Sequence, residues 1–186
     1  MTERPEVPTA AASAASDEGA RTATAAASAA PDEGARTATA ADVVAIVPLV
    51  AAAGDEKRQQ KGGPLWFRRE RRWGDPETEL LATLGADDHE VAVGTIDGVV
   101  VGYGLVRAER LGDGSVLGVI DDIYVDPQAR SIGVGEAVMD HLIAWSRAHG
   151  CFGVDSLALP GDRATKNFFE SFGLVARAIV VHRPLD

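Results

Sequence analysis

The fold is decided by residues 119–149, which read VIDDIYVDPQARSIGVGEAVMDHLIAWSRAH. The first part, up to Val125, has the apolar and β-branched character of a strand, and Asp126-Pro127 ends it. After a short loop the apolar residues recur at helical spacing, and Gly150 is a natural helix stop. The apolar face of this predicted helix carries Val134, Ala137, Val138, Leu142 and Trp145. The pattern predicts a strand, a glycine-containing loop and a helix, in that order.

The loop at residues 128–135 has the properties of an anion site. The first turn of a helix leaves backbone N–H groups unpaired and carries the positive end of the helix dipole. Gly133 and Gly135 lack a Cβ where a ligand would approach, and Arg130 can add charge-assisted hydrogen bonds to phosphate. The P-loop pattern fails because Glu-Ala follows Gly135, and the dinucleotide fingerprint fails because Val138 replaces its third Gly. The alternative is a tight turn whose glycines only let the helix pack on the sheet.

Hydrophobic patterning around this stretch predicts one α/β (α+β) domain with a mixed, mostly antiparallel sheet and about four helices. The expected strands are 35–39, 90–96, 99–109, 115–125, 152–159 and 176–182. The expected helices are 42–53, 76–84, 134–149 and 163–172. Asp97-Gly98 is a two-residue hairpin signal, and the connection from 115–125 to 152–159 is a parallel crossover. Residues 54–64, GDEKRQQKGGP, are predicted to form a mobile polar loop.

The first forty residues contain a tandem repeat. Residues 11–25 read AASAASDEGARTATA and residues 26–40 read AASAAPDEGARTATA, so that only Ser16 and Pro31 differ. Large apolar side chains are absent from the repeat, and little burial could offset the loss of chain entropy on folding. We therefore expect residues 1–34 to be a mostly disordered tail and residues 35–186 to be the folded domain.

Composition argues against several classes of protein. The net charge of −10 argues against nucleic-acid binding, and the basic run between Trp66 and Trp73 is interpreted as a solvated helix face. The single cysteine, Cys151, allows no internal disulfide. No apolar run approaches the length of a membrane span, and the N-terminus is acidic where a signal peptide is basic, so a cytoplasmic location is expected. The four histidines have no convincing metal-ligand spacing, and no metal is expected.

The stretch 119–185 resembles the acetyl-CoA-dependent N-acetyltransferases of the GNAT superfamily. Their signature, between a strand and a helix, is Arg or Gln, two residues, Gly, one residue, then Gly or Ala. The matching residues are Arg130, Gly133 and Gly135. The strand before the signature and the segment 162–174 are similar to the family's fourth strand and last helix. With the weaker first strand, the resemblance covers residues 35–186.

The resemblance implies which residues bind acetyl-CoA. Backbone amides of the loop and first helical turn would hold the CoA pyrophosphate, with the Arg130 side chain alongside. The pantetheine arm would pair with backbone near residues 123–125, where the fourth and fifth strands splay apart. The implied residues are Ile123, Val125, Arg130, Ser131, Ile132, Gly133, Val134, Gly135, Glu136, Asp162 and Phe169.

Two adjacent acids are the candidate catalytic residues. Asp121 matches a position where many family members carry a catalytic Glu, and strand alternation predicts that Asp122 lies on the opposite face of the sheet. Burial would raise the pKa of such a carboxyl and suit a general base. The alternative for each is a salt bridge or electrostatic binding of the amine. Phe169 departs from the family's pattern, because many members have a proton-donating Tyr there. The thiolate would then either depart unaided or take its proton from water, Tyr124 or elsewhere.

The function implied by the resemblance is direct transfer of an acetyl group from acetyl-CoA to a primary amine. The acceptor would be a small molecule, a peptide or a protein, and the acidic charge is compatible with a cation. The alternative is a non-catalytic acyl-CoA-binding module of the same fold, which Phe169 favours. The family's frequent dimers leave a homodimer open.

Overall fold

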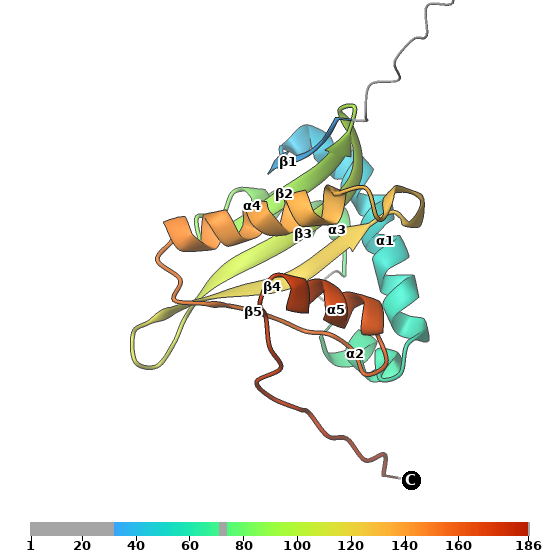
Figure 1. Ribbon diagram of the computed structural model, residues 1–186, viewed down its shortest axis with the longest axis vertical. Helices are drawn as coiled ribbons and strands as arrows, with labels where there is room; N and C mark the ends of the chain where they lie inside the picture. The colour runs from blue at the N-terminus through green and yellow to red at the C-terminus, as the bar shows by residue number, and fades with distance from the viewer. Residues whose placement is uncertain (1–31, 71–73, 186) are drawn as a thin grey trace, which may run out of the picture. The chain divides into compact units, whose positions relative to one another are not determined.

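One mixed sheet of five strands organises the structure, a computed structural model that describes residues 32–70 and 74–185 (Figure 1). The strand order is β1-β2-β3-β4-β5, with the first four strands antiparallel and β5 parallel to β4. The strands are β1 (Glu33–Thr37), β2 (His89–Ile96), β3 (Val99–Arg110), β4 (Val116–Val125) and β5 (Val154–Ser156). This arrangement confirms the predicted fold class.

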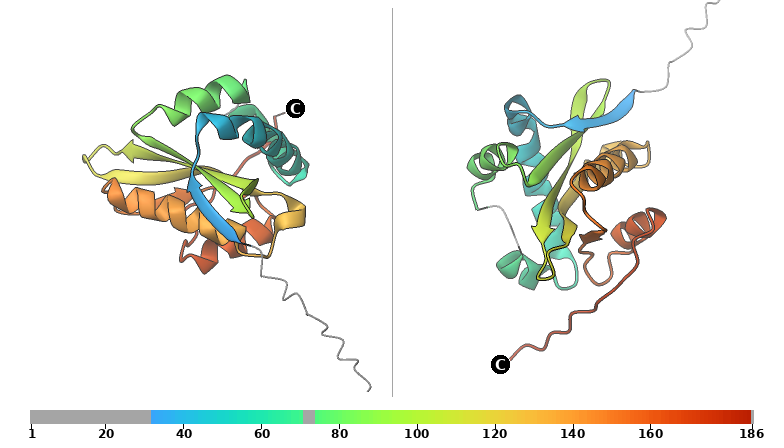
Figure 2. Two further views of the ribbon diagram at one scale, coloured as in Figure 1. Left: turned by 90° about the horizontal axis from the view of Figure 1, so that it is seen from above. Right: turned by 90° about the vertical axis from the view of Figure 1, so that its left-hand side faces the viewer.

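Helices cover both faces of the sheet (Figure 2). One face carries α1 (Val43–Gln59) and α3 (Pro76–Leu84), and the other carries α4 (Val134–Ala148) and α5 (Arg163–Ser171). The short helix α2 (Gly63–Arg69) follows α1. Two single-turn 3-10 helices, η1 (Ala40–Asp42) and η2 (Pro127–Ala129), precede α1 and follow β4.

The sheet separates two apolar clusters. The cluster under α1 and α3 comprises Ala38, Val43, Ile46, Val50, Leu80, Val91, Val93, Tyr103 and Leu105. The cluster under α4 and α5 comprises Ala92, Val106, Ile120, Val138, Met139, Leu142 and Phe169. Because β2 and β3 contribute to both clusters, they are covered on both faces and lie at the centre of the core.

Glycines in the central strands bring α4 close to the sheet. A Cβ added to Gly94 would lie 2.5 Å from Val134 Cγ1, and one added to Gly104 would lie 2.6 Å from Val138 Cγ1. Real side chains cannot approach so closely, so these two glycines permit the observed packing. The first turn of α4, and with it the candidate phosphate loop, is thereby fixed against β2.

Most predicted elements form close to their expected bounds. The turn residues Asp97 (φ 48°) and Gly98 (φ 79°) are both left-handed, as a two-residue hairpin between β2 and β3 requires. The predicted polar loop at 54–64 is wrong, because α1 continues to Gln59 and α2 begins at Gly63. Apolar periodicity ends before these polar turns, so the pattern missed them. Lys57 and Arg58 in the last turn of α1 interact favourably with its dipole.

The predicted closing strand at residues 176–182 is also wrong. This segment has no regular secondary structure, and its apolar side chains are exposed, among them Val180 (77%) and Val181 (89%). The predicted strand 152–159 shortens to the three residues of β5. Both segments have the β-branched composition of strands, but a strand also requires a paired neighbour.

The predicted disordered tail lies almost entirely outside the described residues, as do Arg71, Arg72 and Trp73 of the basic run. β1 begins at Glu33, two residues earlier than expected, and pairs antiparallel with β2. Within the described part of the chain, no helix is both long enough and apolar enough to cross a membrane.

Candidate active site

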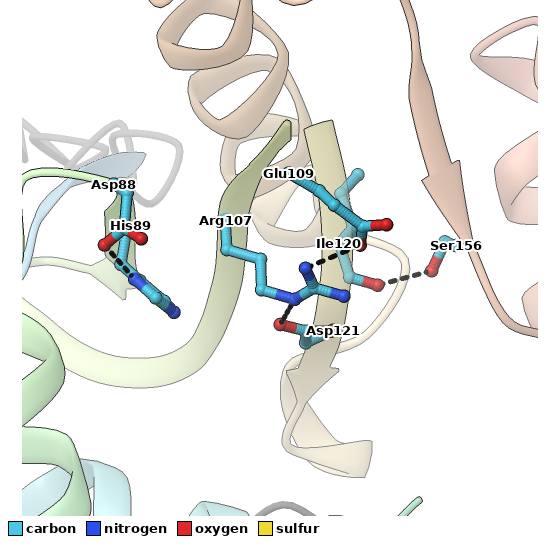
Figure 3. Close-up of polar contacts among 7 residues, drawn as sticks. All are labelled: Asp88, His89, Arg107, Glu109, Ile120, Asp121 and Ser156. Carbon is cyan, nitrogen blue, oxygen red and sulfur yellow. Dashed lines mark hydrogen bonds and ion pairs between the residues drawn. The ribbon is translucent and has the colours of Figure 1, made fainter. Parts of the chain in front are cut away.

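β4 and β5 pair over only three residues and then separate. Gly118, Val119 and Ile120 face Val154, Asp155 and Ser156, and the Ser156 hydroxyl donates to the Ile120 carbonyl at 3.0 Å (Figure 3). Beyond this point β4 runs on to Val125 and pairs with β3 on its other side. The edge of β4 from residue 121 to residue 125 is therefore free of β5 and can accept an extended ligand.

A β-bulge lies at the point where the strands separate. Leu105 of β3 pairs with Asp122, but the next residue, Val106, pairs with Ile120, so that Asp121 is an extra residue in β4. The bulge interrupts strand alternation. Asp122 contacts Lys57 of α1, and Asp121 contacts Arg107, which by alternation lies on the same face of β3 as Leu105, so both carboxylates lie toward the face that carries α1. The prediction that Asp121 and Asp122 lie on opposite faces is therefore wrong, and two acids lie side by side at the mouth of the separated strands.

Asp122 is the more buried of the two acids and is held by two partners. The Tyr103 hydroxyl donates to its Oδ2, and the Lys57 ammonium of α1 lies 2.5 Å from its Oδ1. Burial, followed by the negative charge of Asp122, raises the pKa of Tyr103 well above its usual value, so the phenol stays protonated and donates. The Lys57 ammonium also lies 4.9 Å from the centre of the Trp66 ring.

Asp121 is bound to an arginine on the neighbouring strand (Figure 3). Arg107 Nε donates to Asp121 Oδ2 at 3.1 Å, and Arg107 Nη1 donates to Glu109 Oε2 at 2.7 Å. Arg107 thus engages Asp121 in a charge-assisted hydrogen bond and links it to Glu109. The two acids therefore have different partners: Asp121 is linked to Arg107, whereas the more buried Asp122 is held by Tyr103 and Lys57.

The candidate phosphate loop turns sharply into α4. Ser131 (φ 69°) and Gly133 (φ 98°) are both left-handed, and Gly133 is the N-cap of the helix. The N–H of Ala137 donates to the Gly133 carbonyl at 2.9 Å and is the first in the helix to reach such a partner. The three preceding amides, of Val134, Gly135 and Glu136, point out of the N-terminus as potential anion donors.

The loop lies at the end of the separated part of β4. A Cβ on Gly135 would be 3.4 Å from the Phe168 ring of α5 and 3.7 Å from Val125 Cγ2. The side chain of Val134 is fully buried, whereas that of Ile132 is 40% exposed. The loop therefore presents mainly backbone groups rather than side chains. Such a surface suits binding of the phosphates of a ligand that lies along β4.

Arg130 has partners on the protein itself. Its Nε donates to the Val125 carbonyl at 2.9 Å, and its guanidinium forms a two-pronged ion pair with Glu56 of α1, at 2.7 and 3.2 Å. It also lies 5.3 Å from the Tyr124 ring. Arg130 therefore fastens α1 to the end of β4, and in this geometry its charge is directed to Glu56.

The end of α1 connects the two sides of the gap between β4 and β5. Lys57 reaches Asp122 on β4, and Gln60 Nε2 donates at 3.0 Å to Asp162, the N-cap of α5. A Cβ on Gly62 would lie 3.7 Å from the Pro160 side chain. Burial works against ionisation of Asp162, but hydrogen bonds from Thr165 and Gln60 and the charge of Lys57 hold its pKa below the usual value. We call residues 57–62 the α1 strap.

One polar atom of this strap is buried without a partner. Gln60 Oε1 is inaccessible and accepts no hydrogen bond, although its amide nitrogen is bound to Asp162. A buried acceptor without a donor is unfavourable by about 1–3 kcal/mol. The hydrogen bond from Gln60 Nε2 to Asp162 thus leaves the strap with one unsatisfied buried acceptor.

The remaining predicted residue is apolar and buried. Phe169 lies in the cluster under α4 and α5, and its ring is 5.9 Å from that of Phe168. It can shape the site but cannot donate a proton. Tyr124, the alternative donor, has its pKa raised by burial and by the nearby Glu56. Among the described residues, no group of three or more His, Cys, Asp or Glu side chains is arranged to hold a metal.

Sequence reasoning missed the residues that α1 and β3 bring to the site. Lys57 and Gln60 fall in the run interpreted as a loop, and Tyr103 carries no signal beyond the alternation of its strand. Extending the helical register through Gln59 would have placed Glu56, Lys57 and Gln60 within one turn at the end of α1.

Comparison with known proteins agrees with this geometry. The acetyltransferase (GNAT) family model matches residues 63–174, more than half of the chain. None of the curated protein sequences compared with the chain matches it significantly.

Several solved structures share the fold. A tetramutant of BH1408 protein from Bacillus halodurans superimposes with a TM-score of 0.70 at 19% identity, covering 81% of this chain and 99% of that one. An aminoglycoside N-acetyltransferase, AAC(6')-Iy, in complex with CoA gives 0.66 at 15% identity, with 83% and 95% covered. Glucosamine-6-phosphate N-acetyltransferase from Arabidopsis thaliana gives 0.58 at 21% identity, with 83% and 99% covered.

The motif, the separated strands and the family match lead to the same assignment. The loop residues Arg130, Gly133 and Gly135 lie inside the matched segment, as do the bulge and both acids. The solved structures share the fold over nearly their whole lengths. The chain belongs to the acetyltransferase (GNAT) family.

Proposed function

We propose that the protein transfers the acetyl group of acetyl-CoA directly to a primary amine. The observation that carries the proposal is the juxtaposition of three features around one gap. These are the free edge of β4, the unpaired amides at the start of α4, and a buried carboxylate at the bulge. The amides would bind the pyrophosphate of an acyl-CoA, and the edge of β4 would bind its pantetheine arm. The carboxylate would take a proton from the acceptor amine.

The loop and β4 would hold the cosubstrate. The amides of residues 132–136 would bind the pyrophosphate, with Ser131 beside them. The backbone of Ile123 and Val125 would pair with the amides of the pantetheine arm, and Phe168 and Phe169 would pack against it. Arg130 would contribute in two ways. Its charge would attract the pyrophosphate, and its ion pair with Glu56 would hold the loop in place. The thioester supplies the activated acetyl carbon.

We propose Asp122 as the base and Asp121 as its neighbour in an electrostatic role. Asp122 is 8% exposed and is aligned by the Tyr103 hydroxyl, whereas Asp121 is engaged by Arg107. An incoming ammonium would replace that of Lys57, give a proton to Asp122 and become nucleophilic. Water or Tyr124 would protonate the leaving thiolate.

We propose that the acceptor is a cationic amine, which displaces the Lys57 ammonium from Asp122. The adjacent carboxylates of Asp121 and Asp122 suit an ammonium group, on a small molecule or on a peptide or protein. Similar folds act on an aminoglycoside, on glucosamine-6-phosphate and on a ribosomal-protein alanine, by their names. These three amine classes, with polyamines, form the panel to test. A cytoplasmic location, which is compatible with the single cysteine of the sequence, is part of the proposal.

The test is release of CoA thiol from acetyl-CoA with each amine in turn, followed by mass analysis of the amine. We expect each chain to release many CoA thiols when an amine is present. Acetylation of Cys151, the only cysteine of the sequence, could release no more than one per chain. Tight acetyl-CoA binding without turnover on any amine would instead support the non-catalytic binding module, which the buried Phe169 favours. A protein that binds no acetyl-CoA would contradict both.

We also propose that two copies associate through the C-terminal segment 175–185. Its apolar side chains are exposed, and the segment starts beside β5, where Arg177 forms an ion pair with Asp155. β5 is a short edge strand, and an exposed extended segment next to such an edge favours pairing with another chain. The second copy supplies both an edge and a matching segment.

We expect the wild-type protein to sediment as a dimer and Val180→Asp to sediment as a monomer. A charge at this exposed position would oppose burial in an interface. Val44→Asp is the matched control, because Val44 is also exposed (80%) but lies on α1. A wild-type protein that remains monomeric at tens of micromolar would contradict the dimer.

A further inference from the structure

Lys57 occupies the place that an acceptor ammonium needs. Its Nζ lies 2.5 Å from Asp122 Oδ1, at the bulge where β4 leaves β5. Its charge also contributes to lowering the pKa of Asp162 across the gap. The side chain is only 25% exposed, and its ammonium lies beside the Trp66 ring. The chain has placed one of its own primary amines at the carboxylate proposed as the base.

The other lysines are in a different environment. The sequence contains three lysines, and both Lys61 and Lys166 are exposed. Lys166 forms a helical ion pair with Glu170 on the surface of α5. Uncatalysed acetylation by acetyl-CoA in solution favours exposed amines, and would modify these two before Lys57. A preference for Lys57 would therefore reverse the order of exposure.

We propose that Lys57 is an internal acceptor, which the protein acetylates itself. The inference rests on the proposed function, because acetyl-CoA must first bind along β4. Nζ gives one proton to Asp122, and its lone pair then forms a C–N bond with the thioester carbonyl carbon. The C–S bond breaks, and the CoA thiolate takes the second proton lost from nitrogen. Asp122 releases the first proton to solvent, so that acetyl-Lys57, CoA thiol and one proton result.

Self-acetylation would change the site electrostatically. An amide at position 57 carries no charge, so the ion pair with Asp122 is lost and the carboxylate keeps only the Tyr103 hydroxyl. The strap loses one of its two links across the gap, and the link between Gln60 and Asp162 remains. The modification would therefore remove the internal cation that competes with an external ammonium for Asp122.

The test is incubation of the full chain with acetyl-CoA and no amine, followed by intact-mass analysis and peptide mapping. We expect one acetyl group per chain, on Lys57, at a rate independent of protein concentration because the transfer is intramolecular. Lys57→Arg keeps a cation beside Asp122 but cannot be acetylated in the same way, and should lose the modification. Lys61→Arg is the matched control and should retain it.

Three further measurements separate the inference from the function on which it rests. Acetyl-CoA binding and turnover on the amine panel are measured on the same preparation. Binding and turnover with Lys57 unmodified, or with Lys61 and Lys166 modified faster, would overturn self-acetylation and leave the function standing. Gly133→Glu, which should not bind acetyl-CoA, must lose acetylation of Lys57 but keep the slow background at exposed lysines. Absence of acetyl-CoA binding by the wild type would overturn both.

Discussion

Replacing Asp122 by Asn is expected to lower kcat/KM for amine acetylation by about 10²–10⁴-fold, the range for loss of a general base. Asn keeps the size of the side chain and can still accept the Tyr103 hydroxyl, so the bulge should persist. The affinity for acetyl-CoA should change by less than about twofold, since the proposed contacts to it come from backbone of β4 and α4. Initial rates and calorimetric titration with acetyl-CoA, on the same preparation, separate the two effects.

Asp121→Asn is the matched control for this prediction. The two residues are adjacent and face the same side of the sheet, but Asp121 is paired with Arg107. We expect a loss of activity below about tenfold, because an electrostatic neighbour contributes less than the group that moves the proton. A larger loss of activity for Asp121→Asn than for Asp122→Asn would reverse the assignment. Asp121 would then be the base, and its ion pair with Arg107 would oppose proton transfer to it.

Stability has to be followed in the Asp122 variant. Removing one partner of a buried ion pair costs up to about 3–5 kcal/mol when the other charge is left without solvent. Lys57 retains partial exposure at the end of α1 and can turn to water, so the cost should be smaller. Thermal unfolding of both aspartate variants should therefore show them folded at the assay temperature. An unfolded Asp122→Asn would move the test to Tyr103→Phe, which removes the hydroxyl that aligns the same carboxylate.

The central elements of the fold were predictable because each combines a periodic pattern of apolar residues with a residue that ends the element. The turn at Asp97-Gly98 and the helix from Val134 each have apolar periodicity on one side and a breaker on the other. Elements that depend on distant partners were not predictable. The segment 176–182 has the β-branched composition of a strand, but no neighbour in the described chain pairs with it.

The candidate site was predictable in the same uneven way. The loop 130–135 could be identified because helix-terminus chemistry is local: two glycines and a following helix define it. The bulge could not, because it exists only in the register between β3 and β4, where Ile120 and Asp122 face consecutive residues. The place of Lys57 in the site could not be predicted for a related reason. Its role depends on α1 crossing the sheet to reach Asp122, which no pattern within residues 54–64 indicates.

Gly133→Glu is expected to weaken acetyl-CoA binding at least about 100-fold, which corresponds to roughly 2.7 kcal/mol. Two effects add at this position. The φ of 98° is one that L side chains rarely adopt, and a Cβ would lie 3.3 Å from Glu33 Cγ. The new carboxylate would also lie at the N-terminus of α4, where it would occupy the amides and repel the pyrophosphate. Calorimetry with acetyl-CoA measures the loss directly.

Gly150→Glu provides the matched control, because Gly150 follows the opposite end of the same helix. Its φ of 71° is also left-handed, and an added Cβ would meet nothing within 4 Å. The variant thus carries the same charge and similar backbone strain, which for an L residue amounts to about 1–2 kcal/mol of stability. Wild-type affinity in Gly150→Glu, with loss in Gly133→Glu, would locate the pyrophosphate at the start of α4. Equal losses in both would mean that strain in α4 accounts for the effect, and equal retention would mean that the glycines of the loop only permit helix packing.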